Sequence, residues 1–151
     1  TFTDKIYTCV IPRDLHYIRE RARRRGDKSV SAFAAFLGKA LNIVPVIFGQ
    51  GAEGKPVVKT RNFDMAVEKV MNYAVARVEA GLLTPFVSLS CGLTWTEIED
   101  LPGLNRLRDA CESNGVELLL SQMGITSAIY VGPGSICLAL AAEPHTFNDF
   151  Q

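Results

Sequence analysis

The sequence predicts an α+β fold: a mixed, largely antiparallel sheet of about six strands with four helices packed on it. Strand-like and helix-like segments alternate through all 151 residues, with no Ser/Gly-rich linker, internal repeat or low-complexity stretch. Closely spaced strand pairs near Gly51 and near Gly132 indicate hairpins, which a purely parallel sheet with helical crossovers does not contain. At this length we expect a single domain.

The composition is that of a globular protein, with 48% apolar and 21% charged residues. Lys plus Arg and Asp plus Glu number 16 each, so no net charge directs the chain toward nucleic acid or a membrane surface. No apolar run approaches the roughly 20 residues that a membrane span needs. The chain starts at Thr1 and runs directly into a strand pattern, which predicts that it is a piece of a longer protein.

Apolar residues at helical spacing, together with end signals, predict the helices. Asn62 is placed to cap the clearest of them, and Thr94 with Glu97 forms a capping box at the start of another. Ser29 or Ser31 caps a helix that is apolar nearly all round, so we expect it to be buried on most sides. The predicted helices cover about residues 14–25, 31–41, 62–80 and 94–114. The strand-like segments are IYTCVI, IVPVIF, PVVKT, FVSLSC, ELLLSQ, SAIYV and ICLALAA.

The four cysteines form no CxxC pair and have no histidine at zinc-finger distance. Three lie in strand-like segments, and Cys111 lies on the apolar side of a helix. We therefore expect buried free thiols, which implies a reducing, cytoplasmic location. The cysteines are Cys9, Cys91, Cys111 and Cys137.

No catalytic or metal-binding arrangement can be assembled from the sequence. His16 and His145 have no companion ligands at a repeating spacing, and we expect His145 to face solvent in the polar tail. The segment GQGAEG, residues 49–54, matches the dinucleotide pattern GxGxxG, but strand residues follow it where a helix is required. We interpret it as a turn, and we expect neither an enzyme nor a cofactor.

Six arginines and a lysine crowd the segment from Arg13 to Lys28. Contact with phosphate or nucleic acid is disfavoured, because the chain is neutral overall and Tyr17 alone offers an aromatic platform. A solvated helix face and a docking site for an acidic partner protein both remain open.

The segment YVGPGS, from Tyr130 to Ser135, is the most informative local motif. Glycines on both sides of a proline permit backbone conformations that are closed to other residues. The N–H groups of Gly132, Gly134 and Ser135, with the Ser135 hydroxyl, are predicted to line a nook for an anion, although a plain turn between two strands accounts for the same residues.

Three stretches together resemble the C-terminal domain of the DegV family: SAFAAFLGKALNIVPVI, KPVVKTRNFDMAVEKV and AIYVGPGSICLAL. The resemblance covers about Tyr7 to Ala142. In that family the shared features are a small-residue-rich helix before an LNIKP-type strand, a K-x-R step into an amphipathic helix, and a GPG turn. The resemblance implies that residues 1–151 are a C-terminal lipid-binding domain whose N-terminal α/β partner domain is absent from this chain.

The resemblance also implies a function: binding of one long-chain fatty acid between the two domains, for presentation to a separate fatty-acid kinase. Arg61 and the turn would then face the carboxylate, and the buried helix would flank the acyl chain. Without the N-terminal domain we expect the chain alone to bind fatty acid weakly or not at all. The site residues so implied are Lys28, Phe33, Phe36, Leu37, Arg61, Tyr130, Gly132, Gly134 and Ser135.

Two polar landmarks of the family are replaced here. Lys28, Ser29 and Val30 stand where the family carries Gly-Arg-Ile, and Tyr130-Val131 stands where it carries His-Thr. Lys28 offers a substitute positive charge and the Tyr130 hydroxyl a neutral donor. The alternative is a module of the same fold that binds no lipid and docks a partner through the segment from Arg13 to Lys28.

Overall fold

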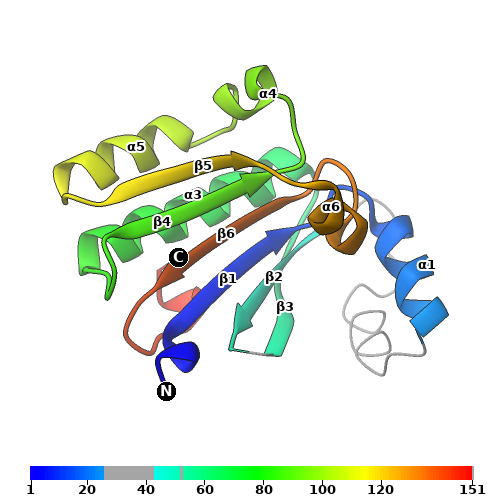
Figure 1. Cartoon of the computed structure of the whole chain (residues 1–151), viewed down its shortest axis with the longest axis horizontal. Helices are drawn as coiled ribbons and strands as arrows, with labels where there is room; N and C mark the ends of the chain where they lie inside the picture. Colours follow the sequence, from blue (N-terminus) through cyan, green and yellow to red (C-terminus); the bar gives the residue numbers. More distant parts are fainter. Residues whose placement is uncertain (26–42, 52, 151) are drawn as a thin grey trace.

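The computed structural model describes residues 1–25, 43–51 and 53–150, which form a six-stranded sheet with helices packed on it (Figure 1). The strand order is β3-β2-β1-β6-β4-β5. β4 and β5 are parallel and all other neighbours are antiparallel, which confirms the predicted class of fold. The strands are β1 (Ile6–Ile11), β2 (Val44–Gln50), β3 (Glu53–Thr60), β4 (Phe86–Cys91), β5 (Glu117–Gln122) and β6 (Ile136–Ala141).

Local end signals fix most of the helices. The Asn62 side chain accepts a hydrogen bond of 2.9 Å from the Met65 N–H, and Thr94 and Glu97 cap each other as predicted. The predicted helix over residues 31–41 lies outside the described residues. No helix of the described part is long and apolar enough to cross a membrane. The described helices are α1 (Leu15–Arg25), α3 (Phe63–Ala80), α4 (Trp95–Glu99), α5 (Leu104–Ser113) and α6 (Ile125–Val131), with 3₁₀ turns at Phe2–Lys5 and Phe147–Phe150.

The segment SAIYV was predicted as a strand, and that prediction is wrong because residues 125–131 form helix α6. Its β-branched and aromatic residues favour a strand. Donors from elsewhere in the chain stabilise the helix instead, since they satisfy carbonyls of its last turn that have no partner within the helix. The Tyr17 hydroxyl donates to the Ile129 carbonyl at 2.8 Å, and the Ser135 hydroxyl donates to the Val131 carbonyl at 2.7 Å. The turn at Pro133 therefore joins a helix to a strand.

One face of the sheet is sealed by α3 and α5. Alternate residues of the central strands point into this core and are inaccessible to solvent, as Cys9, Leu89 and Leu138 show. The core side of α3 presents a stripe that includes Val67 and Ala74. In Figure 1, α3 lies behind the sheet, so that view looks onto the other face.

GQGAEG is part of a hairpin, as predicted. Gly49 pairs with Gly54 across β2 and β3, and Gly51 takes a positive φ of 58° in the turn between them. Gly49 also makes room for Thr8, whose hydroxyl occupies the place of a β-carbon at that position. The glycines of this segment therefore serve the sheet.

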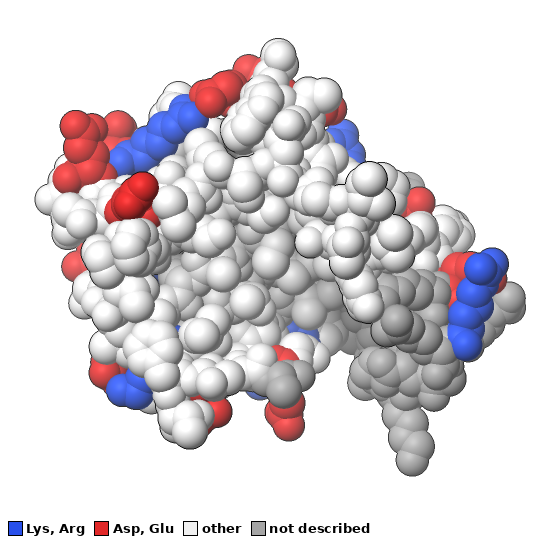
Figure 2. Space-filling model, viewed as in Figure 1, with Lys and Arg blue, Asp and Glu red and all other residues white. Residues whose placement is uncertain are grey.

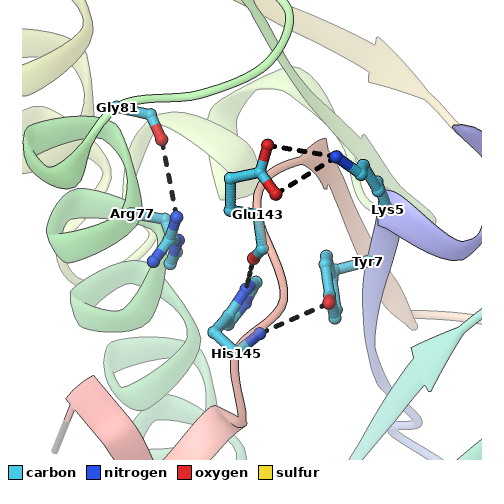
Figure 3. A network of polar contacts seen from close by, with 6 residues as sticks. All are labelled: Lys5, Tyr7, Arg77, Gly81, Glu143 and His145. Atoms are coloured by element: carbon cyan, nitrogen blue, oxygen red, sulfur yellow. Dashed lines mark hydrogen bonds and ion pairs between the residues drawn. The ribbon is translucent and has the colours of Figure 1, made fainter.

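The C-terminal tail folds back between α3 and β1 (Figure 3). The His145 Nδ1–H donates to the Glu143 carbonyl at 2.7 Å, so Nε2 is left to accept from the Tyr73 hydroxyl, also at 2.7 Å. The Tyr7 ring lies 4.0 Å from the His145 ring, and Lys5 pairs with Glu143 at 3.1 Å. His145 is half-buried, so the expectation that it faces solvent is wrong: the aromatic side chains of the core extend to meet the tail.

Candidate functional site

The face of the sheet turned away from α3 and α5 is accessible and carries little charge. On β1, Thr8 and Val10 are half-buried, whereas the residues that alternate with them are sealed. Strand pairing sets these side chains in rows across the sheet. We call this surface the open face and define it by the residues Thr8, Val10, Ser88, Ser90, Leu119, Cys137 and Ala139.

The rows can be followed through the register. Thr8 lies beside Ala139, which lies beside Ser88 on β4. In the next row Val10 lies beside Cys137, which lies beside Ser90. Figure 2 shows charged side chains at the rim of this view and none over its middle among the described residues. Because solvated faces of antiparallel sheets usually carry polar and charged side chains, a face of hydroxyl, thiol and aliphatic groups favours an apolar partner.

Toward the turn at Pro133, the open face ends in two backbone donors. The N–H groups of Gly134 and Ser135 donate to no acceptor within the described residues, but only Gly134 is partly exposed, whereas Ser135 is fully buried. They face Gly92, where a β-carbon would lie 3.1 Å from the Gly134 nitrogen and 3.4 Å from the Ser135 nitrogen. The absence of a side chain at Gly92 thus allows the end of β4 to pack closely against the turn, where the Gly92 N–H donates to the Ser135 carbonyl at 2.8 Å.

The other groups predicted to line the nook are engaged within the protein. The Gly132 N–H donates to the Ala128 carbonyl at 2.9 Å and so ends α6. The Ser135 hydroxyl donates to Val131, and the Ser135 side chain is buried. Gly132 and Gly134 have φ values of 89° and 73°, as their flanking of a proline predicts.

Two residues missed by sequence reasoning pack against this turn. The Tyr17 ring lies on Gly132, where a β-carbon would approach its Cδ1 to 3.1 Å. The Arg13 side chain crosses Gly134, where a β-carbon would lie 2.7 Å from its Cδ. The glycines were a signal for close approach, but nothing in the sequence identified the partners.

Of the remaining site residues, Arg61 and Tyr130 are exposed and four are not described. Arg61 is exposed between β3 and α3, two strands along the sheet from β1. Tyr130 is 52% exposed on α6. Lys28, Phe33, Phe36 and Leu37 lie outside the described residues.

A pocket of about 520 Å³ adjoins the turn on the side of α1 and α6. Among the described residues, the Tyr17 ring and Ile129 form an apolar part of its lining. Charged residues in and next to α1 form the rest. The described lining is Asp14, His16, Tyr17, Glu20, Arg24 and Ile129.

All four cysteines are free thiols, as expected. Cys9, Cys91 and Cys111 are buried, but Cys137 is half-buried in the middle of the open face. Burial raises the pKa of the Cys137 thiol. No group of three potential metal ligands occurs in the part of the chain that the structure describes.

A family model described as an uncharacterised protein of the DegV family matches residues 1–143. The chain belongs to the DegV family. A DegV domain-containing protein of Xanthomonas axonopodis pv. citri is 42% identical over 142 residues, which are 94% of this chain and 45% of that protein. The chain therefore spans about half the length of the curated relatives that it matches.

Solved DegV structures share the fold. The DegV family protein Cg2579 of Corynebacterium glutamicum has a TM-score of 0.70 at 18% identity, over 96% of this chain and 51% of that one. The fatty acid binding DegV family protein SAG1342 of Streptococcus agalactiae has a TM-score of 0.66 at 20% identity, over 93% and 46%. The fatty acid kinase (Fak) B3 protein of Streptococcus pneumoniae, loaded with linoleic acid, has a TM-score of 0.65 at 13% identity, over 92% and 45%.

Proposed function

We propose that the chain is a fatty-acid-binding domain of a DegV carrier, with the acyl chain on the open face and the carboxylate at the turn around Pro133. The observation that carries this proposal is the pairing of an accessible, uncharged sheet face with the partly exposed backbone N–H of Gly134 at its end. Two structural neighbours are described as binding or holding a fatty acid, which supports the same ligand class.

The proposed ligand matches both ends of this surface. Each methylene removed from water contributes about 0.8 kcal/mol, so an acyl chain gains from contact with Val10, Ala139 and Leu119. A carboxylate gains from the N–H group of Gly134, because hydrogen bonds to a charged acceptor are stronger than neutral ones.

One open sheet face covers only one side of an acyl chain, whereas binding pockets commonly enclose most of a ligand's surface. A second wall, from the N-terminal domain of a two-domain carrier, completes the site in this proposal. We therefore expect this chain alone to bind fatty acid weakly, with an affinity poorer than micromolar. Submicromolar binding by this chain contradicts the need for a second wall.

We infer further that the domain carries its ligand and leaves chemistry to a partner. The kinase named in the description of the S. pneumoniae neighbour indicates which class of partner to test. Four free thiols suit a reducing compartment, so we place the carrier in the cytoplasm.

Alkylation of Cys137 tests where the acyl chain lies. A chain that runs from the turn across the open face passes Cys137, which follows Ser135 by two residues. We expect hexadecanoic acid to slow the reaction of Cys137 with N-ethylmaleimide, read by mass spectrometry of the modified peptides. Buried Cys111, on the side of α5, is the internal control and should not respond.

The outcome is decisive in both directions. Protection of Cys137 alone supports the proposal. Equal rates with and without lipid, at concentrations well above micromolar where even the weak binding expected of this chain fills most sites, overturn it and favour a module that binds no lipid.

A further inference from the structure

Arg13 is held from two sides next to the turn around Pro133. Its guanidinium carbon lies 4.8 Å from the centre of the Phe63 ring, in a cation–π contact. Its Cδ packs against Gly134, and the guanidinium carbon is only two bonds further along the side chain. The Arg13 side chain is thus positioned before any ligand arrives.

The charge of Arg13 remains available to a ligand. Within the described residues, no ion pair or hydrogen bond engages its guanidinium, and the residue is exposed. Among the described residues, the charge of Arg13 contributes to a pKa shift at one acid, Glu97. The backbone and side-chain hydrogen bonds of Thr94, and more weakly the charge of Arg13, lower the pKa of Glu97. Because Thr94 occupies a Glu97 oxygen at 2.8–2.9 Å, Glu97 is committed to capping α4.

The surroundings of Arg13 add further positive potential. Phe63 is the first residue of the 18-residue helix α3, so the guanidinium lies at the positive end of that helix dipole. The N–H group of Gly134, the residue against which Arg13 packs, donates to no acceptor among the described residues. Positive potential therefore gathers at the end of the sheet next to the turn around Pro133, where the start of α3 and Gly134 both contact Arg13.

We propose that Arg13 binds the carboxylate of the fatty acid and so makes the site selective for acids over neutral lipids. This inference rests on the proposed function. Arg13 suits the role better than Arg61, for which no described contact fixes the guanidinium. A side chain already held in place loses less conformational entropy on binding, so more of its interaction energy appears as affinity.

A comparison of head groups tests the inference. Arg13→Gln and the matched control Arg61→Gln are assayed by Cys137 protection with hexadecanoic acid and with hexadecan-1-ol. For Arg13→Gln we expect about tenfold weaker protection by the acid, the effect of one lost charge-assisted hydrogen bond, and a change of less than about twofold for the alcohol. Arg61→Gln should change the acid-to-alcohol ratio by less than about threefold, as expected for a mobile surface charge.

The possible results separate the two proposals. If both lipids protect Cys137 in the parent chain and Arg13→Gln leaves the acid-to-alcohol ratio unchanged, Arg13 is not the head-group residue. A ratio that falls in Arg61→Gln instead also overturns the inference. If neither lipid protects the parent chain, the proposed function itself fails. Arg13→Lys keeps the charge but loses the planar fork, so it should restore part of the ratio, which a merely structural role of Arg13 would not produce.

Discussion

At the scale of single residues, the turn around Pro133 depends on the absence of side chains. Gly134 has a φ of 73°, where an L-residue is strained, and the stem of Arg13 occupies the space of its missing β-carbon. Both the left-handed backbone at this position and the packing of Arg13 therefore require a residue without a side chain. Any side chain at Gly134 displaces Arg13 or distorts the turn.

Gly134→Ala separates these two effects when it is compared with Gly115→Ala. Gly115 has a similar φ of 64°, but no atom lies within 4 Å of its β-carbon position. Strain alone should cost Gly115→Ala about 1 kcal/mol in the free energy of unfolding. Gly134→Ala should cost about 1 kcal/mol more, because Arg13 must also move. Urea unfolding measures both variants, and equal losses would show that Arg13 does not pack there.

The sequence predicted the glycines of this site but not their partners. Two glycines beside a proline report unusual backbone angles, because that information is local. Arg13 and Tyr17 reach the same turn from more than a hundred positions away, and no local pattern records such a contact. Arg61 was identified through its motif instead, and the structure places it in the step between β3 and α3, two residues before Phe63.

At the scale of elements, too, the sequence predicts what local signals determine and misses what depends on contacts with distant residues. Helix α3 and strands β4 and β5 have the predicted bounds, because capping residues, glycines and periodicity mark their ends within a few residues. Helix α6 was missed because its stability comes from outside the segment. Ile125 and Ile129 are exposed, so the segment has no apolar stripe that packs against a core and would mark it as a helix.

Tyr17→Phe tests whether α1 holds α6 in its helical form. The variant keeps the ring on Gly132 but removes the hydroxyl that donates to the Ile129 carbonyl. We expect a local loss of about 1 kcal/mol, which should raise amide exchange at Gly132 about fivefold. The Met123 amide, which donates to the Cys91 carbonyl at 2.7 Å, is the control and should be unaffected. Unchanged exchange at Gly132 would show that α6 is stable without Tyr17.

At the scale of the whole molecule, the sheet is sealed on one face and open on the other, and three of the four thiols belong to the sealed side. Burial, and to a lesser extent the charge of Cys137, raises the pKa of Cys91 to about 11. Burial likewise raises the pKa of Cys9 well above its ordinary value. In the unfolded chain these thiols titrate near pH 8.5.

The free energy of unfolding should therefore fall as the pH rises from 8 to 10. Above about pH 8.5 the unfolded chain loses thiol protons that the folded chain keeps, so by pH 10 the unfolded state is favoured by roughly 2 kcal/mol for each such thiol. Urea unfolding under reducing conditions measures the fall, and Cys91→Ala should show a shallower one. A stability that is flat between pH 8 and 10, or equal slopes for both proteins, would contradict this explanation.

The position of β6 in the sheet has a consequence for biosynthesis. β6 joins β3-β2-β1 to β4-β5, yet of the six strands described it is the last to leave the ribosome. Until it emerges, a nascent chain holds two unconnected half-sheets with bare hydrogen-bonding edges, and such edges favour aggregation. Insertion of this final strand completes both halves at once, so the surface that we assign to the lipid comes into being only after translation of nearly the entire domain.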